Sequence, residues 1–410
     1  LEEMESDPQQ RGYVLEKLGD AKEALADHDA SLKHWNEALL LWKKLDEKEK
    51  VAGIYRKMAN VLFYIMDDKE NAEKHCQEAL RILEALPESV ELASLYSDRA
   101  WMQWYVGDLD TARSSAEKAI ELAEQLNAKD IVAHSYSRLG VILRTTGDVK
   151  KAIECNEKAL KIALDNNCLK EAVMAYNALA ISLLHTPTEW RRTQECYEKG
   201  YELARKVGDI WYQSRIAGNL AGRMVAAGNI DKSLSLREEE LTLARKAGQL
   251  SNISGGLRGF GIIHFFLGEW DKSERYFEES WSIAEKSKDF QQMEGGMTAF
   301  GWLCLGRGEY AKAAEWFEKL CAHLEKAGAE KDLNVLRDAS WLIKAYIELE
   351  EIEKADNQID ILRKLALETA DEQLTTLTNT LKAMMLRAQK KFDESIKLFE
   401  KSLQEWEALD

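Results

Sequence analysis

A motif that returns about every forty residues constrains this chain more than any other feature of its sequence. The segment GDLDTARSSAEKA at residues 107–119 returns as GDVKKAIECNEKA at 147–159, and related segments begin at Gly228, Gly268 and Gly308. With the first glycine as an anchor, equivalent positions are Ala26, Asp67, Gly107, Gly147, Thr188, Gly228, Gly268, Gly308, Glu350 and Lys390, at steps of 40 to 42 residues. Units of a repeat array pack only on their neighbours, so we expect one solenoid over residues 1–410 instead of several globular domains.

Small residues recur on both sides of the anchor. Five residues after it stand Ser31, Ala72, Ala112, Ala152, Thr193, Ser233, Ser273, Ala313, Ala355 and Ser395, often followed four residues later by an aromatic residue: Trp35, Tyr197, Phe277, Phe317 or Phe399. Seven residues before it stand Gly19, Ala100, Gly140, Ala221, Gly261, Gly301 and Ala383. The pattern predicts an inner helix of about 17 residues that ends near the anchor, a tight turn and an outer helix of similar length, which cross closely at the small residues.

The composition favours helices throughout. There are only three prolines in 410 residues, Ala, Leu, Glu and Lys are abundant, and no run of alternating β-branched residues occurs. Strong helix formers without helix breakers are typical of an all-α protein. The predicted fold class is therefore all-α.

The order of these residues resembles the tetratricopeptide repeat. The matching features are a Leu-Gly pair in the first helix (Leu139-Gly140), then a turn, then small residues followed by aromatic ones, as at 313–317 (AAEWF). The period is near 40 instead of 34, and the proline that usually closes the second helix is missing apart from Pro87. The resemblance implies a right-handed superhelical solenoid of about ten helical hairpins.

The long form of the repeat is similar to the sensor segments of signal-transduction ATPases with numerous domains (STAND), of the maltose-regulon activator type. It also resembles kinesin light chains and cell-polarity adaptors. The resemblance implies a sensor module that shares its full-length chain with an NTPase domain. We also expect the 410 residues to be part of a longer multidomain protein, since Leu398, Phe399, Leu403 and Trp406 would lack a covering helix. A partner or a second copy of the chain at this C-terminal edge is the alternative.

Charge and hydropathy argue against two classes of partner. The net charge is −16 and basic residues form no block, so a nucleic-acid surface is not expected. The longest strongly apolar run, residues 261–268, is far shorter than the roughly 20 residues that span a bilayer. Six cysteines without a CxxC pair are typical of reduced thiols. We expect a soluble, cytoplasmic protein that binds neither nucleic acid nor membrane.

The resemblance also implies which side chains line the concave wall, because related repeats present them from the first helix of each unit. The rule selects Tyr64, Trp101, Trp104, Tyr105, His134, Ser137, Arg144, Ser182, His185, Arg215, Gly218, Gly222, Gly255, Arg258, Ile262, Phe265, Phe266, Trp302, Arg337, Ser340 and Lys344. Aromatic residues and arginines dominate binding surfaces. The favoured ligand-binding residues are therefore Tyr64, Trp101, Trp104, Arg144, Arg215, Arg258, Phe265, Trp302 and Arg337.

Two features of this wall exceed what a plain scaffold needs. Trp101 and Trp104 lie three residues apart, so both rings face one side of a helix. Glycines gather within the inner helices at Gly218, Gly222, Gly255, Gly256, Gly259, Gly261, Gly295, Gly296 and Gly301. Each costs a helix about 1 kcal/mol relative to alanine, which indicates a close approach by a ligand or by a neighbouring helix. Both explanations stay open.

The sequence contains no recognisable catalytic or cofactor motif. A GxxxxGK[ST] loop, an HExxH motif and a zinc-ligand spacing are all missing, so we expect no enzyme activity, no cofactor and no metal. The leading hypothesis is a binding or sensor module whose concave groove recognises a protein or peptide partner. A small-molecule inducer sensor and a structural scaffold or oligomerisation arm are the alternatives.

Overall fold

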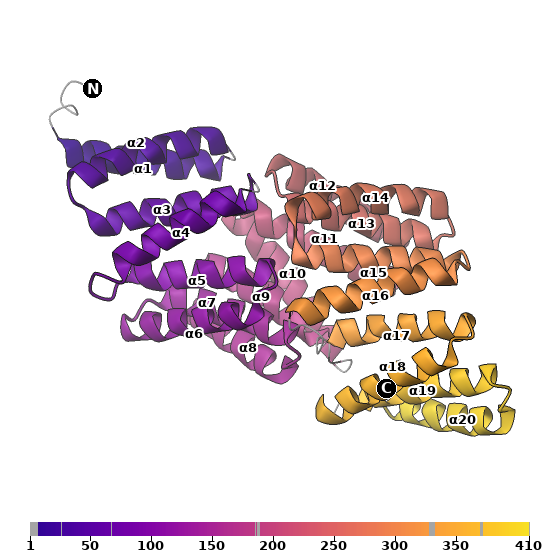
Figure 1. The fold of residues 1–410 in the computed structure, drawn as a ribbon. Helices are drawn as coiled ribbons and strands as arrows, with labels where there is room; N and C mark the ends of the chain where they lie inside the picture. The colour runs from indigo at the N-terminus through magenta and orange to yellow at the C-terminus, as the bar shows by residue number, and fades with distance from the viewer. Residues whose placement is uncertain are drawn as a thin grey trace.

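The computed structural model describes residues 7–25, 27–66, 68–184, 186, 189–327, 333–369 and 372–409, which form twenty α-helices and no strand. The helices are α1 Pro8–Ala24, α2 His28–Lys44, α3 Lys48–Tyr64, α4 Lys69–Leu83, α5 Val90–Tyr105, α6 Leu109–Gln125, α7 Lys129–Thr145, α8 Val149–Asp165, α9 Leu169–Leu183, α10 Trp190–Val207, α11 Ile210–Ala226, α12 Ile230–Lys246, α13 Leu250–Phe266, α14 Trp270–Ser287, α15 Phe290–Gly306, α16 Tyr310–Ala327, α17 Leu333–Glu348, α18 Ile352–Thr369, α19 Glu372–Ala388 and α20 Phe392–Leu409. Successive pairs form ten hairpins that stack into a right-handed superhelix (Figure 1). The predicted all-α solenoid is confirmed.

The anchor residue is the left-handed residue between the two helices of a hairpin. Its φ is positive in every described unit: at Gly107, Gly147, Gly228, Gly268 and Gly308, and also at Glu350 and Lys390. Ala26, Asp67 and Thr188 lie outside the described residues. An L side chain is strained in this conformation, which explains why glycine is the commonest anchor. The next residue often caps the second helix, as Asp148 does by accepting a hydrogen bond from the Lys151 amide.

Small residues let the two helices of a hairpin approach. The small residue five positions after the anchor is at most 3% exposed in all ten units. A Cβ atom at Gly261 would lie 2.4 Å from the Phe277 ring, and one at Gly301 would lie 2.4 Å from the Phe317 ring. The aromatic ring nine positions after the anchor therefore packs directly on the glycine seven positions before the anchor. This contact is the physical basis of the repeated pattern.

The superhelix closes on itself between units that are far apart in sequence. The Tyr105 hydroxyl at the end of α5 donates a hydrogen bond to Asp289 Oδ2 at 2.5 Å, and the Lys69 ammonium donates to the Ser287 carbonyl. A Cβ atom at Gly107 would lie 3.0 Å from the Phe290 ring. One hydrophobic cluster accordingly joins helices α5–α8 to helices α15–α19. In Figure 1 the N-terminal and C-terminal halves lie side by side, with α9 and α10 behind them.

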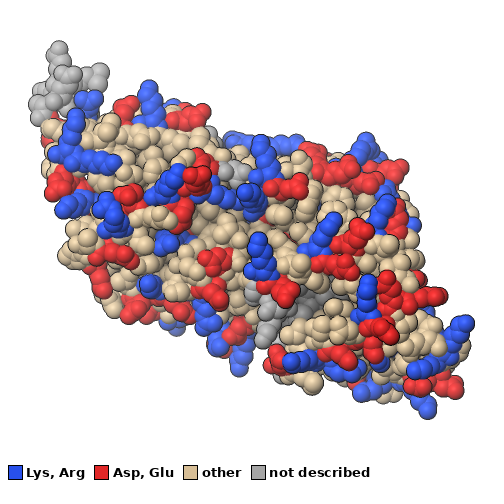
Figure 2. Space-filling model, viewed as in Figure 1, with Lys and Arg blue, Asp and Glu red and all other residues tan. Residues whose placement is uncertain are grey.

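The outer surface mixes both signs of charge. Figure 2 shows basic and acidic side chains interspersed over one face, without a block of a single sign. Apolar side chains are exposed at the C-terminal edge, where Leu403 is 60% exposed and Trp406 37%. Among the helices described above, none combines the length and the apolar character needed to cross a lipid bilayer.

Candidate functional site

A chamber lies on the inner surface of the superhelix. It consists of an outer cavity of about 360 Å³ and a narrow inner cavity of about 20 Å³. The two cavities share Trp101, Arg138, Met174, Trp211 and Tyr212, and we call them together the inner chamber. Its lining comes from the odd-numbered helices and the residues beside them, α1 to α11 with Gln291 of α15. The first helices of the first six hairpins and of the eighth therefore contribute to the chamber.

Aromatic rings cover much of the chamber wall. Trp101 and Trp104 stack with their ring centroids 4.4 Å apart, and the Trp104 indole donates a hydrogen bond to Thr145 Oγ1 at 3.0 Å. Trp104 is only 3% exposed, whereas Trp101 is half-buried and lines both cavities. Trp104 therefore anchors the pair in the core, and Trp101 is the ring that a ligand would meet. Trp211 and Tyr212 of α11 form a second, edge-to-face pair with centroids 4.7 Å apart.

A buried ion network contributes Asn60, Asp98 and Arg138 to the lining of the outer cavity, beside the aromatic rings. Asp98 accepts hydrogen bonds from Arg56 at 2.8 Å, from Arg138 at 2.9 Å and from Asn60 at 2.9 Å. Burial alone would raise the pKa of the Asp98 carboxyl, but the charges of Arg138 and Arg56 hold this pKa well below its usual range. Arg56 also pairs with Glu91 at 2.5 Å. The network contains two cations and two anions, and it ties α3, α5 and α7 together.

His134 lines the outer cavity next to this network. Burial, reinforced by the charge of Arg138, lowers the pKa of the His134 imidazole to about 3. The ring is therefore neutral near pH 7 and contributes a hydrogen-bonding group without charge. His185, which the sequence placed on the same wall, lies outside the described residues.

The mouth of the chamber carries unbalanced negative charge. Glu23 of α1, Glu171 of α9 and Asp209 before α11 line it together with Lys170. Loss of hydration raises the pKa of the Glu171 carboxyl, the charges of Asp130 and Asp209 add to the rise, and Lys170 opposes it. Neither Glu23 nor Glu171 forms an ion pair within the part of the chain that the structure describes. Asp209 uses one carboxylate oxygen to cap α11, accepting from the Tyr212 amide at 3.0 Å.

The inner end of the chamber is polar and narrow. Arg215 stacks over Trp211 and donates a hydrogen bond to Gln291 Oε1 at 3.2 Å, which links α11 to α15. Arg144 and Asn177 line the same cavity. The Ser137 hydroxyl is buried there without a hydrogen-bond partner among the described residues. A volume of about 20 Å³ holds about one water molecule.

The structure divides the favoured ligand-binding residues into two groups. Tyr64, Trp101, Trp104, Arg144 and Arg215 line the chamber. Arg258, Phe265 and Trp302 are not among the described residues that line it. Arg337 has a side chain outside the described part of the chain.

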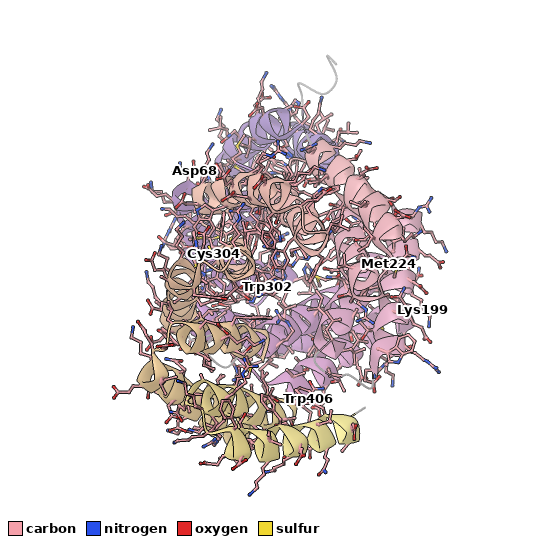
Figure 3. All side chains as sticks on the ribbon, turned by 90° about the vertical axis from the view of Figure 1, so that its right-hand side faces the viewer. Asp68, Lys199, Met224, Trp302, Cys304 and Trp406 are labelled. Atoms are coloured by element: carbon pink, nitrogen blue, oxygen red, sulfur yellow. The ribbon has the colours of Figure 1, made fainter. Side chains whose placement is uncertain are left out.

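The residues outside the chamber make contacts within the protein. Arg258 donates a hydrogen bond to Gln292 Oε1 at 2.8 Å, and Phe265 packs edge-to-face on Phe266. Trp302 packs against Trp341 with the ring centroids 6.2 Å apart. In Figure 3 Trp302 lies within the ring of helices, whereas Lys199 lies at its outer edge. These side chains belong to the packing of the second half of the superhelix.

Side chains of the same protein fill the space above most of the clustered glycines. Cβ atoms at Gly218, Gly259 and Gly295 would lie 2.1 to 2.3 Å from Glu240, Arg237 and Arg258. The close approach that these glycines predict is therefore present, and neighbouring side chains make it. A ligand is not needed to explain them.

Several chamber residues escaped the sequence rule. Asp98 and Arg138 stand one residue after a position of the rule, and Glu171, Trp211 and Tyr212 stand about one turn before the first position of the rule in their units. Glu23 reaches the mouth because the superhelix brings α1 toward α9 and α11. A pairing of Asp98 with Arg138, at equivalent positions of consecutive units, is the one signal in the sequence that points to the buried network.

The chamber is suited to recognition by stacking, hydrogen bonds and charge. No group of His, Cys, Asp and Glu side chains within the described residues has the arrangement of a metal site.

Burial raises the pKa of the thiols of Cys76 and Cys196, which makes these cysteines poor nucleophiles. All six cysteines are free.

Comparison with known proteins agrees with the geometry. Tetratricopeptide repeat family models match residues 50–125, 105–165 and 382–409. The chain is a tetratricopeptide-like repeat protein. No curated protein sequence matches it.

Solved structures resemble this repeat protein over most of its length. The Rap conjugation gene regulator of plasmid pLS20, solved in complex with the Phr* peptide, is 12% identical, with a TM-score of 0.59 over 79% of this chain and 98% of that one. The apo form of RapI is 15% identical, with a TM-score of 0.51 over 68% of this chain and 98% of that one.

A STAND protein with a tetratricopeptide repeat sensor from Pyrococcus horikoshii is also similar. It is 16% identical, with a TM-score of 0.47, and the match covers 88% of this chain and 53% of that one. At these identities the likenesses show the fold alone, and the third is too weak to support a functional argument.

Proposed function

We propose that this repeat protein is a non-catalytic binding module whose inner chamber recognises a protein or peptide partner. The observation that carries the proposal is the combination of half-buried rings, Trp101 and Trp211, with polar groups that lack partners within the described chain, the Tyr64 and Ser137 hydroxyls. Rings supply contact area, and orphaned hydroxyls can bond a backbone amide or carbonyl.

The likeness to the plasmid pLS20 regulator is compatible with this proposal. That protein was solved with a peptide bound, which indicates that a superhelix of this class can accommodate one. The outer cavity of the present chain is about 360 Å³ in volume, enough for one or two side chains of a peptide. We therefore expect the partner to insert a short segment and to contact the rim with the rest.

We further propose that the module is the sensor part of a signalling ATPase or regulator in the cytoplasm. A partner bound between α5 and α11 would change the spacing of hairpins that also contact α15. Because the rotations between hairpins add up along the solenoid, this local change can alter the pitch of the whole superhelix. In this proposal residues 1–410 form one solenoid within a longer chain that carries an NTPase domain. Sequencing of the full-length gene tests it, and a gene without an NTPase domain would contradict the ATPase assignment.

A peptide library tests the binding function directly. Random hexapeptides displayed on phage are selected on the purified protein, and the enriched peptide is titrated by calorimetry. Trp211→Ala removes a chamber ring and should weaken binding at least about tenfold, as buried aromatic anchors do. Trp190→Ala is the matched control, because Trp190 is 55% exposed on the outer helix α10. Equal loss in both variants, or no enriched peptide, would contradict the proposal.

A small-molecule inducer is the second candidate function. The outer cavity of about 360 Å³ falls within the range of about 300 to 1,000 Å³ that small-ligand sites occupy. Native mass spectrometry of the freshly purified protein should then show a retained compound, which Trp211→Ala releases. A spectrum of the bare chain alone would count against this candidate.

The exposed C-terminal edge supports a third proposal, an oligomerisation arm. Phe392, Ile396 and Leu403 are each more than half exposed on α20. Light scattering after size exclusion should show dimers that form with rising concentration and that Leu403→Glu abolishes. A monomer at all concentrations would exclude this arm.

A further inference from the structure

We propose that the mouth of the inner chamber binds a basic group of the partner, a guanidinium or an ammonium, between Glu23, Glu171 and Asp209. This inference rests on the proposed peptide-binding function and adds the chemistry of the ligand. The occupant is a segment of a peptide or protein that carries an arginine or lysine side chain.

The balance of charge in the chamber carries the first step. Arg56 and Arg138 are compensated by Asp98 and Glu91 through ion pairs of 2.5 to 2.9 Å. At the mouth three carboxylates face one cation, Lys170. Loss of hydration without an ion pair destabilises the charged form of a carboxylate. A bound cation would stabilise that charged form again.

The aromatic lining carries the second step. Tyr64, Trp101, Trp211 and Tyr212 line the same cavity as the mouth carboxylates. Ring faces attract cations. The protein already uses this geometry, with Arg138 5.9 Å from the Trp101 ring centroid and Arg215 5.2 Å from the Trp211 ring centroid. Rings and carboxylates around one opening therefore select for a positive group.

An unpartnered hydroxyl carries the third step. The Tyr64 hydroxyl is buried without a hydrogen-bond partner among the described residues and lines the outer cavity. It can accept a hydrogen bond from an N–H group of the bound segment.

An anionic ligand fits the chamber less well. The arginines that do not belong to the Asp98 network, Arg144 and Arg215, line the inner cavity. That cavity has room for about one water molecule, so a carboxylate or phosphate would not fit beside them. Arg215 is moreover engaged with Gln291 and Trp211.

The test uses the enriched hexapeptide of the phage selection. Its arginine is replaced by citrulline, which has the same shape without charge, or its lysine by norleucine. For the native protein we expect the dissociation constant to rise at least tenfold on this replacement. For Glu171→Gln the same replacement should raise the dissociation constant clearly less than it does for the native protein, because one of the three carboxylates around the basic group has lost its charge. Glu279→Gln, on the exposed face of α14, is the control and should behave as the native protein.

The possible outcomes separate this inference from the proposed function. Enriched peptides that are neutral or acidic, but whose binding Trp211→Ala weakens, would overturn the basic ligand and leave the peptide function standing. Failure to enrich any peptide would overturn both. If Glu171→Gln does not fold, Glu23→Gln on α1 takes its place with the same expectation, because Glu23 is exposed at the mouth. An unchanged citrulline effect in the folded variant would contradict the assignment.

Discussion

Asp98→Asn should be among the most damaging conservative changes in this protein. The substitution keeps the size of the side chain but removes the charge that compensates Arg56 and Arg138. The Asp98 side chain is 9% exposed and that of Arg138 10%, so water can replace little of the lost interaction. Breaking a buried ion pair from one side costs about 3 to 5 kcal/mol.

The remaining contacts of the two arginines place the expected loss near the lower limit. Arg56 keeps Glu91, and Arg138 keeps the Ser97 hydroxyl at 3.2 Å. We therefore expect Asp98→Asn to lower the free energy of unfolding by about 3 kcal/mol at pH 7. Urea unfolding followed by circular dichroism at 222 nm and by tryptophan fluorescence measures the change.

A matched control separates burial from the mere presence of an ion pair. Asp271 also pairs with an arginine, Arg307, at 3.1 Å, but its side chain is 99% exposed. Asp271→Asn should cost less than about 1 kcal/mol. In Asp98→Asn, the second change Arg138→Met should recover part of the loss, because it removes the uncompensated cation. Equal small losses in Asp98→Asn and Asp271→Asn would refute the role given to the network.

Three further predictions concern the repeat and the chamber. Gly301→Ala should lower the free energy of unfolding by about 1 to 3 kcal/mol, because its Cβ atom would lie 2.4 Å from the Phe317 ring. Gly222→Ala is the control: the nearest atom to its Cβ would lie 3.7 Å away, so this change should be neutral or should stabilise the protein by up to about 1 kcal/mol. Urea unfolding measures both variants. Lys390→Gly should stabilise the protein by up to about 1 kcal/mol in the same assay, because Lys390 has a φ of +62°; a loss instead would contradict the strain argument. Folding lowers the pKa of the His134 imidazole to about 3, so the stability of the protein should fall as the pH drops below about 6.5. Between pH 8 and pH 5 the native protein should lose up to about 2 kcal/mol more stability than His134→Gln does. Parallel pH profiles of the two proteins would contradict this.

The local architecture could be predicted from the sequence because one unit determines it. A left-handed residue at Gly147, a small residue at Ala152 and a small partner at Gly140 are constraints within a single hairpin, and the chain repeats them. Each of these preferences is weak by itself, but their repetition along the chain makes the period of about forty residues clear. The resemblance supplies the direction in which the first helices face, and Trp101 and Arg215, which it selects, line the inner cavity.

The closure of the superhelix could not be predicted in this way. The contact of Tyr105 with Asp289 joins residues 184 positions apart and depends on the small rotation between successive hairpins. An error of a few degrees per unit, added over four units, would separate them. The position of Glu23 at the chamber mouth depends on the same rotation.

The role of the clustered glycines and the surroundings of Arg258 could not be predicted for a different reason. Glycine in a helix signals a close approach but does not say what approaches, and at Gly295 it is the side chain of Arg258. A rule of fixed offsets from the anchor also selects Arg258 and Trp302 in units whose inner faces pack on other helices. Only the assembled superhelix shows that the outer cavity lies between α1 and α11.

A crystal structure of the protein with its selected hexapeptide tests the central claim most directly. We predict density for the peptide in the inner chamber, in contact with Trp101 and Trp211, with a basic side chain near Glu171. A peptide bound to the outer, even-numbered helices or to the exposed edge of α20, with the chamber empty, would contradict the account.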